Sequence, residues 1–182
     1  DITKYAPEGL RLVIRDIYDL IPSELGSKNR RFKLSSIQGV KRFAQVTDHF
    51  LWLAKAGVAL PVYNVAAPTS PLLFGEQRSL FKLFYLDTGM LMSSYPKSVA
   101  QAVLSGDAAG EFGMNMGAAY EGFVAQELKA HGFALRYFSS KRIGELDFVE
   151  ERQDGGILAI EVKSGKSFAR HAALDHALAV KD

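Results

Sequence analysis

Residues 143–163, IGELDFVEERQDGGILAIEVK, contain two runs in which apolar and polar residues alternate on either side of a Gly- and Asp-rich turn. Alternation with a period of two is typical of strands that bury one face, so the segment predicts a β-hairpin. If the loop is 152–156, the pairing is symmetric about Asp154. This register places Asp147 directly opposite Glu161 on the same face of the hairpin.

The opposed carboxylates of Asp147 and Glu161 indicate a site for a divalent cation. Carboxylates on directly opposed residues, with Cβ atoms roughly 5 Å apart, repel each other unless a cation lies between them. Mg²⁺ or Mn²⁺ prefers such oxygen ligands and keeps bound water. Lys163 shares the face of Glu161 and would lie beside that water or a substrate phosphate. The set predicts metal-dependent hydrolysis of a phosphodiester.

A second interpretation of the same residues needs no metal. A Glu-x-Lys tripeptide, as at Glu161 to Lys163, is common on the solvated face of a strand. Asp147 in the opposing position favours a site over a plain surface. Glu145, on the same face as Asp147, is a second-rank candidate.

The first half of the chain predicts helices followed by two strands. The β-prone runs VALPVYNV and SLFKLFYLD predict a hairpin. Helices in front of a hairpin are the outline of a winged-helix-like domain, which we assign to residues 1–95. Apolar spacing and the breakers Pro22 and Gly57 place the helices over residues 8–21, 37–43 and 45–56.

The second half predicts a separate α/β domain. Residues 96–113 read as a connector with a short helix, and 114–131 show helical spacing that ends at Gly132. A strand over 133–138 and the hairpin follow. We therefore expect a mixed sheet with flanking helices over residues 114–182, α+β overall.

The charge is distributed unevenly along the chain. Residues 1–95 carry 12 Lys+Arg and 8 Asp+Glu, whereas residues 96–182 carry 10 and 12. The stretch 27–42 contains no acid, which is compatible with contacts to nucleic-acid phosphates, with a solvated loop or with a surface that docks another domain. Its basic residues are Lys28, Arg30, Arg31, Lys33, Lys41 and Arg42.

Composition bounds the remaining possibilities. The chain has no cysteine, which excludes disulfides and thiolate metal sites and is compatible with a cytoplasmic location. No uninterrupted apolar run reaches the roughly 18 residues of a membrane span. SGKSF at 164–168 fails the Walker pattern because Ile160 stands where glycine is required, so we expect any ATP site outside this chain.

Three segments together resemble a known family: KLFYLDTGML (82–91), YEGFVAQEL (120–128) and the hairpin. They are similar to the uncharacterised C-terminal region of bacterial and archaeal AAA-type ATPases, where a winged-helix-like segment precedes a PD-(D/E)XK nuclease-like domain. The resemblance covers nearly the whole chain and implies a restriction-endonuclease-like sheet. Leu146 stands where the superfamily name has proline, and we expect the chain to end before the last strand and helix of that core.

The resemblance implies a role for each acid. Asp147, Glu161 and Glu121 would be ligands of Mg²⁺ or Mn²⁺, and Lys163 would be the catalytic lysine beside them. The implied partners are nucleic acid, with DNA preferred, and an upstream ATPase domain of the same chain that would bind ATP.

Two rival interpretations stay open. In one, the nuclease-like fold is non-catalytic and binds DNA or a partner protein in the service of the ATPase. In the other, both domains mediate assembly. The intact set of Asp147, Glu161 and Lys163 favours the enzyme.

Overall fold

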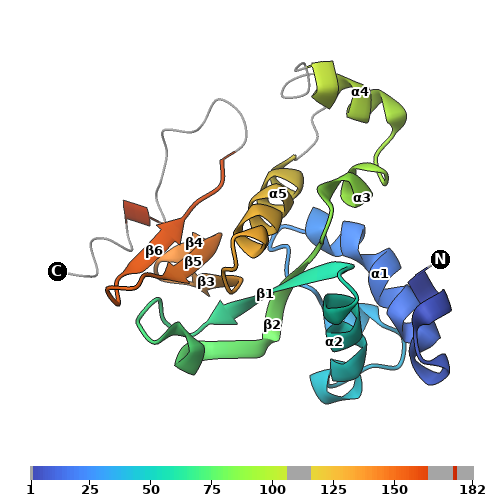
Figure 1. Cartoon of the computed structure of the whole chain (residues 1–182), viewed down its shortest axis with the longest axis horizontal. Coiled ribbons are helices and arrows are strands. Elements are labelled where there is room, and N and C mark those ends of the chain that lie inside the picture. The colour runs from blue at the N-terminus through green and yellow to red at the C-terminus, as the bar shows by residue number, and fades with distance from the viewer. Residues whose placement is uncertain (1, 106–115, 164–173, 176–182) are drawn as a thin grey trace.

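The computed structural model describes residues 2–105, 116–163 and 174–175 of the 182-residue chain (Figure 1). The fold is mixed α+β, as expected, with a four-stranded sheet in the order β2-β1-β3-β4 and a two-stranded sheet of β5 and β6. The strands are β1 (Ala59–Val65), β2 (Glu76–Tyr85), β3 (Arg136–Ser140), β4 (Gly144–Leu146), β5 (Phe148–Glu151) and β6 (Ile157–Ile160).

Helices flank the four-stranded sheet. The α-helices are α1 (Arg11–Gly26), α2 (Thr47–Lys55), α3 (Thr88–Met92), α4 (Lys97–Ser105) and α5 (Gly117–Ala130). Short 3-10 turns cover Ile2–Tyr5, Glu8–Leu10, Leu34–Ser36, Phe43–Gln45 and Leu72–Gly75. Within the described residues, no helix is long and apolar enough to cross a membrane.

The strand β1 lies at the centre of the main sheet. It pairs antiparallel with β2 and parallel with β3. Its side chains are buried along most of its length, which is typical of a strand covered on both faces. The strands expected as the wing of the 1–95 domain therefore share a sheet with β3, which comes from the other side of the predicted 96–113 connector.

Neighbouring residues of β2 point to opposite faces of the sheet and meet different helices. Phe81 packs among aromatic rings around α2, with its ring centroid 4.9 Å from that of Phe50 and 5.8 Å from that of Phe32. Lys82 points to the other face and meets Glu121 of α5. The sheet is thus the middle layer between α2 and α5.

Helix α1 is longer than its sequence predicts. We expected it to end at Pro22, yet it continues to Gly26 with Pro22 inside. A proline in a helix has no N–H to donate to the carbonyl four residues earlier. That carbonyl belongs to Tyr18, and the hydroxyl of Tyr85 donates to it at 2.9 Å. The strand thereby satisfies the acceptor that the proline leaves open.

The helix expected over residues 37–43 is wrong. The structure has 3-10 turns before and after this stretch, and Gly39 takes a φ of 78° between them. This left-handed conformation interrupts a helix. The helix expected over 45–56 is present as α2, and Gly57 follows it with a φ of 66°, as its stop signal predicts.

The hairpin register is confirmed, but one of its strands is divided. Phe148 pairs with Ile160 and Glu151 with Ile157, which is the predicted symmetry about Asp154. The segment expected as one strand over 143–149 splits at Asp147, because β4 pairs with β3 and only β5 pairs with β6. Leu146 of β4 and Val149 of β5 both pack in a small core with Val65, Leu72 and Phe138. This shared core accompanies the passage of the chain from one sheet to the other.

We predict that Phe81→Ala lowers the free energy of unfolding by about 3–5 kcal/mol, since it removes the ring at the centre of the aromatic cluster. Phe74→Ala is the matched control, because Phe74 is 86% exposed and Phe81 only 1%. The control should change stability by about 0.5 kcal/mol or less. Urea denaturation followed by circular dichroism measures both, and similar losses would contradict this view of the core.

Candidate functional site

A fully buried lysine lies at the centre of the candidate site. Strand β2 carries Lys82 on the face covered by α5. Its Nζ lies 3.1 Å from Glu121 Oε2, 2.7 Å from Glu145 Oε1 and 3.7 Å from Asp147 Oδ1. Helix α5, strand β4 and the break after β4 thus each bring one carboxylate to the same ammonium group.

Arg30 supplies a second cation to this cluster. Its guanidinium forms an ion pair with the other carboxylate oxygen of Glu121, which is itself buried. Arg30 takes a φ of 49°, uncommon for a residue other than glycine, at the end of a turn closed by its N–H to the Ser27 carbonyl. Both oxygens of Glu121 are therefore engaged by cations.

The ring of Tyr137 forms an aromatic wall beside the cations. Lys82 Nζ lies 5.2 Å from its centroid and Arg31 Cζ lies 5.9 Å away, both within the range of cation–π attraction. Burial raises the pKa of Tyr137 to about 12, although the Arg31 guanidinium lowers it in part. The phenol is therefore protonated at neutral pH and adds no charge to the cluster.

We call Lys82, Arg30, Glu121, Glu145 and Asp147 the Lys82 cluster. Its three carboxylates and two cations leave one excess negative charge. Charges taken out of water are stable only when each is paired or hydrogen-bonded. The cluster meets that condition, because each carboxylate contacts Lys82 and Glu121 also contacts Arg30.

Glu161 and Lys163 pair with each other at the edge of the cluster. Lys163 forms an ion pair with Glu161. The β5–β6 pairing ends at Phe148 and Ile160, one residue short of the predicted Asp147–Glu161 pair, and the Val162 N–H donates to Asp147 Oδ2 at 2.8 Å. The structure thus brings together Glu121, Glu145 and Asp147 around Lys82, with the Glu161–Lys163 pair beside Asp147 at the end of the hairpin.

The basic residues of segment 27–42 divide into two groups. Arg30 and Arg31 turn inward to Glu121 and Tyr137. The other four are exposed and form no ion pair with a described residue: Lys28, Lys33, Lys41 and Arg42.

Comparison with protein families divides the chain into two matched parts. Residues 1–100 match a domain of unknown function, DUF8612. The chain belongs to the DUF8612 family. Residues 116–180 match a second domain of unknown function, DUF4143, which is commonly found in AAA-ATPase-associated proteins. Searches of curated proteins and of solved structures give no match.

The Lys82 cluster does not fit the metal site that the sequence predicts for this DUF8612 chain. Arg30 and Lys82 hold both oxygens of Glu121, while Lys82 and the Val162 N–H face those of Asp147. In the part of the chain that the structure describes, no group of three acidic, His or Cys residues is arranged to hold a metal ion. An ammonium group lies where the carboxylates converge.

Sequence reasoning missed Lys82 and Glu150. A single charged residue within the apolar run SLFKLFYLD was the available signal for Lys82. Glu150 gave a weaker signal, because it stands in the hairpin as one acid among several. Glu150 is buried, and its Oε1 has no hydrogen-bond partner among the described residues.

We predict that Lys82→Met lowers the free energy of unfolding by about 3–5 kcal/mol, because it leaves buried Asp147 without its cation and Glu121 with Arg30 alone. Lys55→Met, at the exposed end of α2, should change stability by about 0.5 kcal/mol or less. Chemical denaturation of the three proteins at neutral pH makes the comparison. A loss below about 1 kcal/mol for Lys82→Met would show that the cluster is held mainly by other contacts.

We predict that Glu150→Gln raises the free energy of unfolding by an amount that depends on pH. Burial raises the pKa of Glu150 from 4.5 to about 7, and Arg136 lowers it only in part. The stability that this carboxyl contributes is therefore fully present below its unfolded pKa and is lost as the pH rises through about 7. The neutral amide avoids this loss, so the variant should gain about 1–2 kcal/mol over the wild type between about pH 5 and pH 8.

Urea denaturation at both pH values measures this gain. Glu8→Gln, at an exposed position, is the control and should show no such difference. A Glu150→Gln effect that is the same at both pH values would contradict the raised pKa.

Proposed function

We propose that this chain is the C-terminal part of an AAA-type ATPase, that it binds DNA, and that its nuclease-like domain is non-catalytic. The observation that carries this proposal is Lys82, whose ammonium group meets Glu121, Glu145 and Asp147. In a nuclease of the resembled superfamily, acids of this kind would be ligands of a metal ion. The lysine occupies the place between these acids, and it cannot supply the metal-bound water that such hydrolysis needs.

The exposed basic residues support DNA as the partner. Lys28, Lys33, Lys41 and Arg42 lie within one short segment and have no ion pair with a described residue. Such cations release counterions when they contact phosphates, which provides affinity without sequence specificity. The match to DUF4143 supports the link to an ATPase, since this domain is common in AAA-ATPase-associated proteins.

A Mg²⁺-dependent nuclease is the second candidate. It is favoured by the position of the Glu161–Lys163 pair beside Asp147 at the end of the hairpin. In that case Asp147, Glu161 and Glu121 would hold the ion, which would supply an activated water, and Lys163 would lie beside the phosphate. Lys82 and Arg30 would first have to release Glu121.

We predict that replacing Lys28, Lys33, Lys41 and Arg42 together by glutamine weakens binding to a short DNA duplex by about tenfold or more at low salt. The slope of log K against log salt should become shallower by up to about 4, since at most four phosphate contacts are lost. Fluorescence anisotropy over a salt series measures both quantities.

The matched control replaces four exposed cations elsewhere on the chain, Lys55, Lys97, Lys141 and Arg142, by glutamine. It changes the net charge equally, so an equal loss of affinity in both variants would contradict a specific surface at segment 27–42. Absence of DNA binding by the wild type would contradict DNA as the partner.

The same wild-type protein, incubated with plasmid or single-stranded DNA and Mg²⁺ or Mn²⁺, should show no cleavage above that of Asp147→Ala. Cleavage that is lost in both Asp147→Ala and Lys163→Ala would overturn the non-catalytic proposal and establish the nuclease.

A further inference from the structure

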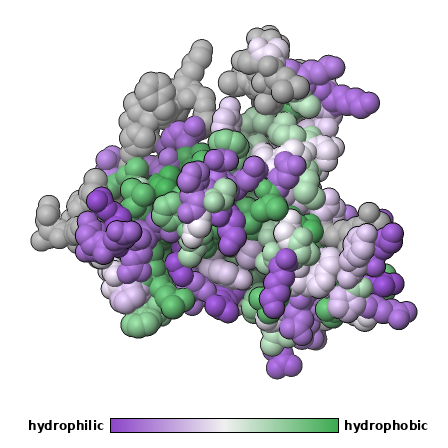
Figure 2. All heavy atoms as spheres, in the orientation of Figure 1, coloured by the Kyte–Doolittle hydropathy of each residue, from purple (hydrophilic) through white to green (hydrophobic). Residues whose placement is uncertain are grey.

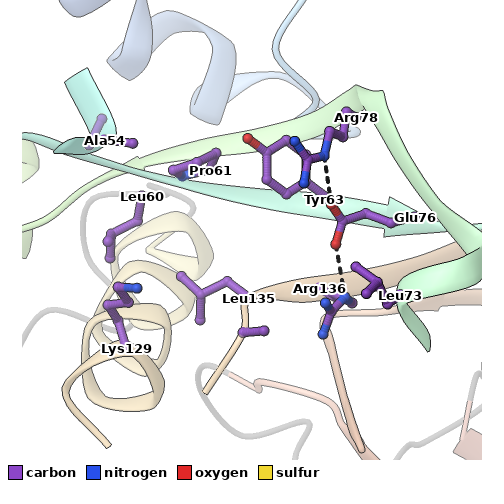
Figure 3. Close-up of a pocket in the computed structure, with 12 residues that line it drawn as sticks. Ala54, Leu60, Pro61, Tyr63, Leu73, Glu76, Arg78, Lys129, Leu135 and Arg136 are labelled. Atoms are coloured by element: carbon purple, nitrogen blue, oxygen red, sulfur yellow. Dashed lines mark hydrogen bonds and ion pairs between the residues drawn. The ribbon is translucent and has the colours of Figure 1, made fainter. Parts of the chain in front are cut away.

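A pocket of about 300 Å³ opens beside β1 and the start of β3, and its lining includes Ala54 of α2 and Lys129 of α5 (Figure 3). Arg136 and Tyr137 are neighbours in β3, so their side chains point to opposite faces. Tyr137 lies beside Lys82, whereas Arg136 lines the pocket together with Tyr63 of β1. The volume is at the lower end of the range of about 300–1,000 Å³ typical of small-molecule sites.

One carboxylate holds two guanidinium groups at one end of this pocket. Glu76 Oε1 lies 3.0 Å from Arg78 Nε, and Glu76 Oε2 lies 3.0 Å from Arg136 Nε (Figure 3). A guanidinium has five N–H donors, and each arginine uses its Nε for Glu76. Among the described residues no further hydrogen bond holds either arginine, so their terminal NH₂ groups remain available to a ligand.

The middle of the pocket is apolar. Figure 3 shows Leu60, Pro61 and Leu135 between the arginine end and Lys129, which comes from the end of α5. Leu73, from the turn Leu72–Gly75, lines the pocket at the arginine end. Exposed hydrophobic side chains lie over this turn, at the lower left of Figure 2. A ligand there would gain from burying a compact apolar body.

The charge of the lining favours an anion. Lys129, Arg78 and Arg136 carry three positive charges against the one negative charge of Glu76, an excess of two. Glu150 also acts on Arg136, but burial raises the pKa of Glu150 to about 7, so below that pH it is largely uncharged. The excess of positive charge is therefore greatest in mildly acidic solution.

We propose that this pocket binds a small organic anion, with a carboxylate or phosphate group at Arg78 and Arg136 and an apolar body against Leu60, Pro61 and Leu135. Glu76 positions the two arginines, so that their terminal NH₂ groups meet one anionic group. Paired N–H donors of this kind suit the oxygens of a carboxylate or a phosphate. The site is independent of the DNA-binding proposal, because its lining includes none of the basic residues Lys28, Lys33, Lys41 and Arg42.

Phenyl phosphate, benzoate and inorganic phosphate are the probes, titrated into the ¹⁵N-labelled chain at about pH 6.5 and followed by NMR. Phenyl phosphate or benzoate should bind with a Kd of about 1 mM or tighter and shift the amides of Leu60, Leu135 and Arg136. A preference for one over the other identifies the anionic group.

The decisive variants are Arg136→Gln and Arg78→Gln, which should weaken binding at least tenfold and at least threefold, respectively. Arg15→Gln is the matched control, because Arg15 and Arg78 are each 67% exposed and each pair with an acid. The control should change the Kd less than twofold. If circular dichroism shows that Arg136→Gln does not fold, Arg78→Gln alone carries the comparison.

Three results would overturn the proposal. One is the absence of binding for all probes up to about 10 mM. Another is equal weakening by Arg78→Gln and Arg15→Gln. The third is equal affinity for phenyl phosphate and inorganic phosphate, which would show that the apolar body of the ligand contributes nothing to binding.

Discussion

The ammonium group of Lys82 is the interaction on which much of this fold depends. It draws together a strand, a helix and the break between two sheets, because Glu121, Glu145 and Asp147 each come from a different element. A buried ion cluster gives little net stability compared with apolar packing. An arrangement that separates its members is nevertheless unfavourable, because it leaves a buried charge without a partner. The cluster thereby selects one relative position for α5 and the sheet.

The alternation of side chains along a strand separates two environments by a single residue. Phe81 and Lys82 are neighbours in β2, and one enters the aromatic core while the other enters the ion cluster. Arg136 and Tyr137 repeat the arrangement in β3, where one lines the pocket and the other borders the cluster. In both strands, one step along the chain therefore changes the surroundings of the side chain completely.

Local patterns predicted the elements well and their partners poorly. The β5–β6 register followed from period-two alternation and turn residues, and the convergence of Glu145 and Asp147 followed from their shared face. The split of the strand at Asp147 did not, because it depends on Leu146 and Val149 packing against Val65, which is distant in sequence. The cation was missed for the same reason, since Lys82 and Glu121 lie 39 residues apart.

Asp147 also has a mechanical consequence. One of its oxygens faces Lys82 of the main sheet, and the other accepts the N–H of Val162, directly beyond the β5–β6 hairpin. A single carboxylate thus ties the two sheets at the residue where the chain passes between them. A load that pulls the hairpin away from the body of the protein is therefore carried in part by this side chain to the buried ammonium group, and in part by the apolar contacts of Val149 and the hydrogen bonds that Glu151 accepts from Ser70 and Leu72.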